Sequence, residues 1–293
     1  MSTQAIPAYG PSALGGSLKR FIELTLTLAR TEFKLRYFGS ALGYLWSLMR
    51  PLLFFGVIYV FFTQIIDVGK GIPHYGVYLL TGIVLWTYFG EATGACVQCL
   101  VQREALLRKV RFPRMVIPLS VSLTSTFNLA MNSIAVIVFA LVNGISPRWS
   151  WLEMIPIALG FVLLATGVGM LLSALYVRYR DMQPIWEVLS QMLFYASPIM
   201  YVASSYKQFE HAALTLNPLA LLLTQMGYAF VHPAPVQTEV SPGVYVPVQH
   251  MRSALVASGG PVHVLISLSI IVLTFALGWW FFTREAPRVA ENL

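Results

Sequence analysis

Charged residues are scarce in this chain: they make up 11% of its 293 residues, while hydrophobic residues make up 57%. A soluble domain carries roughly 25% charged residues, so a water-exposed surface of ordinary composition is excluded. The mean hydropathy of +0.70 points the same way. We therefore predict an integral membrane protein. The formal charge of +7 does not indicate nucleic-acid binding, because the cations sit at the ends of apolar segments, where they anchor topology and meet anionic lipid headgroups.

Motifs for nucleotide, metal and covalent chemistry are also missing. The sequence has no G-x-x-x-x-G-K-[ST] phosphate loop, so we expect no cofactor here and expect ATP and Mg²⁺ to be bound by another chain. Cys96 and Cys99 cannot form a four-ligand zinc site alone and are expected to pack in an apolar helix. The five histidines lack ligand spacing. Residues 1–17 lack the basic and apolar regions of a cleavable signal peptide.

The cations that are present fall into four clusters separated by long apolar runs. Fifteen of the 19 Lys and Arg residues lie in 19–50, 103–114, 178–180 and 284–288. Loops rich in Lys and Arg face the cytoplasm in membrane proteins. Both termini and two internal loops are therefore predicted to be cytoplasmic.

Six segments are apolar over the ~20 residues that a spanning helix needs. They lie at about Leu42–Ile66, Tyr75–Val101, Met115–Pro147, Met154–Val177, Pro184–Val202 and Ser253–Thr283. Six crossings return the C-terminus to the side of the N-terminus. We therefore predict an all-α membrane protein in three parts: a cytoplasmic N-terminus (1–40), a six-span domain (41–283) and a cytoplasmic tail (284–293).

Two further segments have helical patterns. Ser17–Phe38 separates apolar from basic residues, which predicts an amphipathic helix on the cytoplasmic membrane surface. Leu214–Val231 is apolar enough for a seventh span, but Asn217-Pro218 interrupts it, and a seventh crossing would put Arg284 outside. We therefore favour a short re-entrant or interfacial element before the last span. The Pro-rich stretch that follows predicts an extended outer loop with a small hairpin around 241–243.

Two cytoplasmic segments and one carboxylate are candidates for function. The segment 103–114 mixes apolar residues with cations; it is either an ordinary charged loop or a docking surface, because exposed apolar clusters usually meet a partner. In the tight turn at 178–181, Asp181 is expected to pair with Arg178 or Arg180 and to cap the next helix. Glu91 lies in the second span and must pair or face water, unless it lies at the outer interface.

Four stretches together resemble one known family: Leu35–Pro51, Leu107–Arg114, Arg178–Asp181 with Phe194–Pro198, and Leu216–Leu219. The chain resembles the membrane subunits of type-2 ATP-binding-cassette exporters of polysaccharides, most of all the Wzm-type permeases for O-antigen and galactan, followed by teichoic acid and capsule exporters. The stretches cover nearly the whole chain in the same order. The outer connection with Pro233–His250 is longer than a minimal permease needs, which leaves an added contact at the exit open.

The resemblance implies a homodimer in the bacterial inner membrane, two copies of a nucleotide-binding ATPase subunit, and a lipid-linked glycan with a polyprenyl diphosphate carrier as substrate. It also implies a coupling helix that docks into the ATPase, with the residues Arg103, Leu106, Leu107, Arg108, Lys109, Val110, Arg111, Phe112 and Arg114. A diphosphate entry site is the hypothesis for the first-span cluster, with interfacial anchoring as the alternative. The residues of the expected substrate path are Arg36, Tyr37, Tyr44, Trp46, Arg50 and Glu91.

Three other functions remain open on the sequence. One is an exporter of a small molecule or drug, which genomic neighbours would distinguish. Another is a polytopic membrane transferase, which would need acidic or histidine residues clustered at one membrane face. The third is a passive channel, which would need no docking loop.

Overall fold

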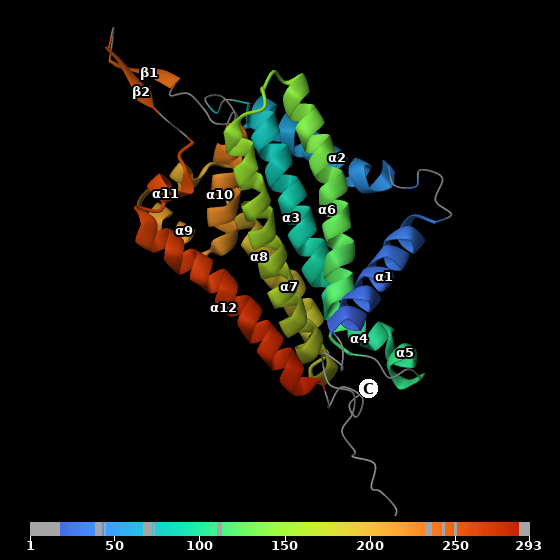
Figure 1. Cartoon of the computed structure of the whole chain (residues 1–293). Coiled ribbons are helices and arrows are strands. Elements are labelled where there is room, and N and C mark those ends of the chain that lie inside the picture. The colour runs from blue at the N-terminus through green and yellow to red at the C-terminus, as the bar shows by residue number, and fades with distance from the viewer. Residues whose placement is uncertain are drawn as a thin grey trace, which may run out of the picture.

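The structure is a computed structural model that describes residues 18–38, 43, 45–66, 72, 74–109, 113–231, 236–241, 244–248 and 251–286. Helices make up most of it (Figure 1). The helices are α1 (Leu18–Tyr37), α2 (Leu45–Val60), η1 (Phe61–Ile65), α3 (Tyr75–Val97), α4 (Cys99–Gln102), α5 (Glu104–Lys109), α6 (Val116–Val142), η2 (Trp149–Glu153), α7 (Met154–Arg178), α8 (Met182–Tyr195), η3 (Ala203–Phe209), α9 (Glu210–Leu216), α10 (Pro218–Val231), α11 (Ala254–Ala257) and α12 (Pro261–Glu285), and the strands are β1 (Val236–Ser241) and β2 (Val244–Val248).

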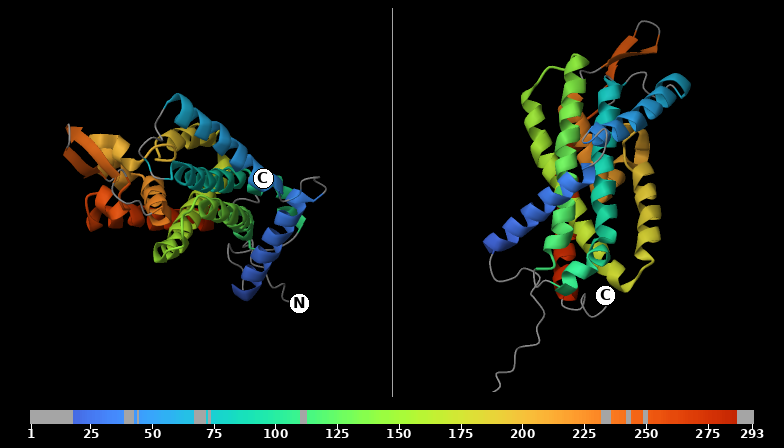
Figure 2. Two further views of the ribbon diagram at one scale, coloured as in Figure 1. Left: turned by 90° about the horizontal axis from the view of Figure 1, so that it is seen from above. Right: turned by 90° about the vertical axis from the view of Figure 1, so that its right-hand side faces the viewer.

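Helices α3, α6 and α7 run side by side, and α12 packs along α7 (Figure 1). Helix α1 lies across α6 at an angle, and α2 also leans away from the bundle (Figure 2). The α4–α5 segment, the α7–α8 turn and the end of α12 lie at one end of the bundle, which we call the basic end. The β1–β2 hairpin projects from the opposite end, the hairpin end. Residues of three predicted basic clusters thus share one end.

Helix α3 is the centre of the bundle. Sixteen of its 23 residues are buried, and it packs against α2, α6, α7, α8 and α10. Every residue from Val77 to Leu85 is buried, whereas the residues of the second half that are not buried, among them Trp86, Gly90 and Glu91, recur at helical spacing on one face. The helix also carries Glu91 and several Tyr, Thr and Gly residues.

Helices α7 and α12 approach each other at two glycines. A Cβ atom on Gly278 would collide with the carbonyl oxygen of Gly167, and one on Gly167 would lie 2.7 Å from the Cα of Phe275. The two backbones are therefore in direct contact. Small residues permit this close packing between membrane helices, where apolar side chains gain little from leaving the lipid.

Four described helices are long and apolar enough to cross a membrane: Leu45–Ile65, Val116–Val142, Trp149–Arg178 and Pro261–Glu285. A fifth is obtained if the bent pair of η3–α9 and α10 is counted as one span. This agrees with a multi-pass membrane protein. The predicted number of six spans requires α3 and the shorter α8 as well.

The predicted fifth span differs from the structure. A single helix was expected to reach Val202, but α8 ends at Tyr195. Pro198 has no N–H and disfavours helical geometry at Ser197, so the helix cannot continue. The irregular stretch that follows is held by side chains: the Tyr78 hydroxyl donates to the carbonyl of Pro198 at 2.5 Å, and the Tyr75 hydroxyl donates to that of Met200 at 2.7 Å.

The predicted interruption at Asn217-Pro218 is present. The η3–α9 segment (Ala203–Leu216) and α10 are bent by 106° at this point. The Asn217 side-chain oxygen accepts hydrogen bonds from the amides of Leu219 and Ala220 at 3.1 and 3.3 Å, and Pro218 occupies the first helical position. Most of α10 is buried, so protein surrounds the polar backbone at the break.

Two strands form an antiparallel hairpin where the sequence predicts one. The pairing runs from Val236 opposite Val248 to Ser241 opposite Val244. The helical membrane class agrees with the prediction, and the hairpin is a small addition to it. The chain is a helical bundle with one projecting hairpin (Figures 1 and 2).

Candidate functional site

A short helix, α5, lies within the predicted docking segment, at the basic end (Figure 1). The second predicted span reaches it through a break: α3 ends at Val97, Gln98 leaves helical geometry at φ −95° and ψ 0°, and Arg103 separates α4 from α5. The sequence prediction of one helix to Val101 missed this break, which contains neither proline nor glycine.

The side chains of the docking segment divide into exposed and packed residues. Leu106 is 39% exposed, whereas Leu107 packs against a buried cluster at the basic end. Arg114 is 5% exposed, so it does not belong to the predicted basic surface. Arg108 and Lys109 end the helix, and Val110, Arg111 and Phe112 lie outside the described residues.

Arg103 connects this segment to α1. Its guanidinium donates to the Glu32 carboxylate at 2.5 Å and to the carbonyl of Cys99 at 3.4 Å. Partial burial raises the pKa of Glu32 above its usual value, although the charges of Arg103 and Arg36 act in the opposite direction. The carboxylate is thus held between two arginines in a partly desolvated position.

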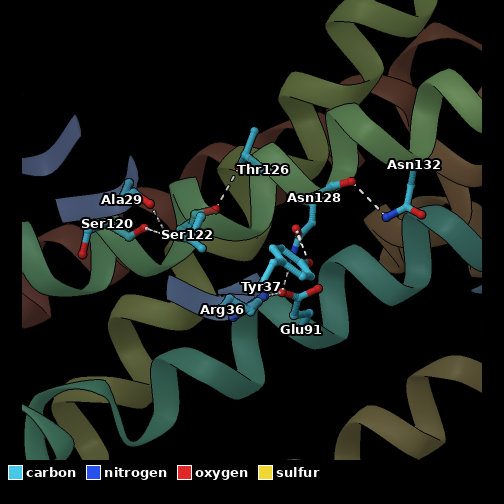
Figure 3. Close-up of polar contacts among 10 residues, drawn as sticks. Ala29, Arg36, Tyr37, Glu91, Ser120, Ser122, Thr126, Asn128 and Asn132 are labelled. Carbon is cyan, nitrogen blue, oxygen red and sulfur yellow. Dashed lines mark hydrogen bonds and ion pairs between the residues drawn. The ribbon is translucent and has the colours of Figure 1, made fainter. Parts of the chain in front are cut away.

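A second ion pair, one helical turn further along α1, reaches the centre of the bundle. Arg36 pairs with the Glu91 carboxylate of α3, and the Asn128 amide of α6 donates to the same carboxylate at 2.7 Å (Figure 3). The Tyr37 hydroxyl donates to the Asn128 side-chain oxygen at 2.8 Å. Of the two interpretations of Glu91, the structure supports pairing between helices. We call these four residues the α1 network.

The other predicted path residues do not join this network. Trp46 and Arg50 are exposed on α2, and Tyr44 lies outside the described residues. In the described part of the chain, the Arg50 side chain has no hydrogen-bond or ion-pair partner, whereas Arg36 is already neutralised by Glu91. A joint phosphate site of Arg36 and Arg50 would therefore have to break the pair with Glu91.

The turn between α7 and α8 is built differently from the prediction. Asp181 makes neither an ion pair nor a capping hydrogen bond with its side chain among the described residues. Arg178 and Arg180 instead lie over the rings of Tyr179 and Tyr176, at 5.3 and 5.1 Å from the ring centroids. Cation–π contact thus replaces the expected carboxylate contact.

The described part of the chain contains no group of three His, Cys, Asp or Glu residues that could hold a metal ion. Cys96 and Cys99 are buried free thiols, and the Cys96 thiol lies 3.6 Å from the carbonyl oxygen of Pro118. Both positions agree with the predicted packing role.

Comparison with known proteins gives the family. Residues 23–231 match the model of the ABC-2 type transporter membrane family. The chain belongs to this family. It is 32% identical over 208 residues to the O-antigen export system permease protein RfbA of Klebsiella pneumoniae, which covers 71% of this chain and 80% of the relative. It is 30% identical over 209 residues to the protein of the same name from Myxococcus xanthus, with the same coverage.

The family region includes the α1 network, the α4–α5 segment and α10, and ends before the hairpin and α12. As a member of a transporter membrane family, the chain is a transport component. Each carboxylate of the two α1 contacts is paired with an arginine.

Sequence reasoning missed the buried polar residues of α6, the helix against which α1 packs. Thr124 donates to the carbonyl of Ala29 at 3.3 Å, and Ala29 is fully buried. The polar residues that are buried on α6 are Ser120, Ser122, Thr124, Ser125, Asn128 and Asn132. Their spacing along one apolar segment is the signal that could have found them, since polar residues inside membrane helices usually face protein.

Proposed function

We propose that this chain is the channel-forming subunit of an ATP-driven exporter that moves a lipid-linked polysaccharide outward across the bacterial plasma membrane. Family membership supports the transport role, and the named O-antigen export permeases support the polysaccharide class. In this proposal the chain forms a homodimer. It works with two copies of an ATPase subunit, because the chain contains no phosphate loop of its own.

The proposed orientation places the basic end in the cytoplasm and the hairpin end outside. The α4–α5 segment, the end of α7 and the end of α12 share one end of the bundle (Figure 1). These elements carry Arg103, Arg178 and Arg284, and such residues are retained on the cytoplasmic side. In this orientation α1 lies along the inner part of the membrane, and α3 and α8 complete six spans. The η3–α9–α10 segment remains in the outer half as a re-entrant element.

The proposed mechanism begins at α5. ATP binding in the partner subunit moves α5, and the Glu32–Arg103 pair carries this motion to α1. The α1 network then carries it to α3 and α6 through Glu91 and Asn128. The observation that supports this route is that both ion pairs lie on one helix, at positions 32 and 36, and that they reach two different parts of the chain.

Two leucines on α5 allow a direct test of docking. Leu106→Glu alters an exposed side chain and should reduce the amount of ATPase subunit that co-purifies, with the permease still present at its usual membrane level. Leu107→Glu alters a packed side chain and should reduce that membrane level. Equal co-purification of the ATPase with wild type and Leu106→Glu would contradict docking at this face.

The substrate class is tested by deletion and complementation in the native bacterium. Cells without the permease should accumulate lipid-linked glycan inside and lose it from the surface, and the wild-type gene should restore it. Normal surface glycan in the deletion strain would instead favour an exporter of another compound.

A further inference from the structure

A cavity lies at the hairpin end, apart from the α1 network. It has a volume of about 470 Å³ and is bordered by the end of α2 with η1, the start of α3 and the end of α6. This volume is in the range of small-molecule sites. Glu91 is 16 residues further along α3 than Tyr75, which lines the cavity. At 1.5 Å per residue the two positions are about 24 Å apart.

Aromatic rings form the walls of this cavity. The rings of Phe55 and Tyr59 are 5.4 Å apart, Phe55 meets Phe139 edge-on at 5.5 Å, and Tyr59 stacks with Tyr75 at 6.3 Å. A Cβ atom on Gly76 would lie 3.2 Å from the Tyr59 ring, so glycine allows this ring to lie against α3. The rings are thus fixed by contacts from three helices.

Polar side chains complete the lining. The Tyr59 hydroxyl and the His74 imidazole make no hydrogen bond in the described part of the chain. The Asn143 amide donates to the carbonyl of Phe139 at 2.7 Å, which leaves its side-chain oxygen as an acceptor. No described residue of the lining is Lys, Arg, Asp or Glu.

The backbone around the cavity is unusual at two places. His74 is one of two described non-glycine residues with positive φ, at φ 50° and ψ 40°. The end of α2 widens into the π-helix η1, which carries Thr63 into the lining. Left-handed residues and π-helical turns are both frequent at functional sites.

We propose that this cavity binds a neutral sugar unit of the exported glycan on the outer side of the membrane. Pyranose C–H faces pack on aromatic rings, and sugar hydroxyls use both donors and acceptors such as Tyr59, His74 and Asn143. A phosphate group would need a cation or a forked guanidinium, which the described lining lacks. The inference rests on the proposed function for its substrate class.

Cysteine protection tests the site on intact spheroplasts that contain the permease and its ATPase. Thr63→Cys places a thiol in the lining, in a background of Cys96→Ala and Cys99→Ala that must first be shown to export glycan. Gln208→Cys, exposed on η3 outside the cavity, is the control. An impermeant maleimide is added with or without the host's own polysaccharide, cleaved from its lipid.

The polysaccharide should slow labelling at position 63 at least fivefold and leave position 208 unchanged. Tyr59→Leu should abolish the protection, whereas His74→Asn, which tolerates the left-handed backbone, should weaken it. Equal labelling with and without polysaccharide at position 63 overturns the proposal. So does protection by glycerophosphoethanolamine but not by polysaccharide, which would indicate a lipid headgroup site. The proposed function is tested separately by the deletion strain. Surface glycan that persists in that strain refutes the export function, whereas the labelling experiment tests sugar binding in the cavity.

Discussion

Glu91 is a carboxylate among apolar helices, and its two partners lie on either side of it in the sequence, both far from it. Arg36 precedes it by 55 residues and Asn128 follows it by 37. Sequence alone identified Glu91 as costly and in need of a partner, but it could not choose that partner, because no local spacing connects α1 with α3. The sequence also suggested a phosphate role for Arg36. An arginine that binds a lipid phosphate and one that pairs with a distant carboxylate can have the same aromatic neighbours in sequence, so the local sequence does not distinguish them.

The α1 network predicts a non-additive pair of substitutions. Glu91→Gln leaves the Arg36 charge without its counter-ion and should lower the melting temperature of the purified complex by a few degrees. Adding Arg36→Gln should recover most of that loss, because the unpaired charge is removed. Arg30→Gln, an exposed cation on the same helix, is the matched control and should change little. Simply additive effects at positions 36 and 91 would show that the two side chains act independently.

Glu32 predicts a pH-dependent difference in stability. Because burial raises its pKa above 4.5, the folded state favours the protonated carboxyl. The contribution of Glu32 is therefore fully present below the unfolded pKa and is lost as pH rises through the folded pKa. Glu32→Gln mimics the protonated form, so it should match wild type at about pH 4 and become the more stable protein as pH increases.

Thermal unfolding in detergent between about pH 4 and 7 measures this difference. Glu23→Gln, which alters an exposed carboxylate on the same helix, should show a smaller dependence. A stability difference between Glu32→Gln and wild type that shrinks as pH rises would mean that the Arg103 contact outweighs burial.

At the scale of elements, the long apolar segments predicted their helices well. Met115–Pro147 contains α6, and Met154–Val177 coincides with α7 to within one residue. The break at Asn217-Pro218 was also predictable, because both residues favour helix starts. The break at Gln98 was not, since neither proline nor glycine marks it in the sequence. The early end of α8 at Tyr195 could have been inferred from Pro198.

The α7–α12 contact depends on glycine, so Gly278→Ala should be strongly destabilising. The added methyl group would collide with the Gly167 carbonyl, and the only relief is separation of two packed helices. We expect a loss of about 1–3 kcal/mol, seen as reduced folded protein in membranes and a lower melting temperature. Gly94→Ala is the matched control: its Cβ atom meets nothing within 4 Å, so the change should be neutral or stabilising. Equal stability of the two variants would contradict direct backbone packing.

For the whole molecule, the open question of topology is whether the bent segment crosses the membrane. The η3–α9 segment and α10 meet at a bend of 106°, which departs far from a single straight span. Helices α9, α10 and α11 all lie in the half of the molecule near the hairpin (Figure 1). Both observations favour a segment that enters and returns on one side. Composition could not decide this, because the hydropathy of 214–231 is the same for a span and for a buried re-entrant helix.

Cysteine labelling at three positions decides between six and seven spans. In a background without Cys96 and Cys99, Lys207→Cys should react with an impermeant maleimide in intact spheroplasts, whereas Arg180→Cys and Arg284→Cys should react only after the membrane is permeabilised. The physical reason is that an even number of crossings places the α7–α8 turn and the end of α12 on the same side, where their arginines are held in the cytoplasm. If position 284 reacts from outside while position 180 remains protected, the η3–α9–α10 segment crosses the membrane and the seven-span arrangement is correct. If position 180 also reacts from outside, the proposed orientation itself is wrong.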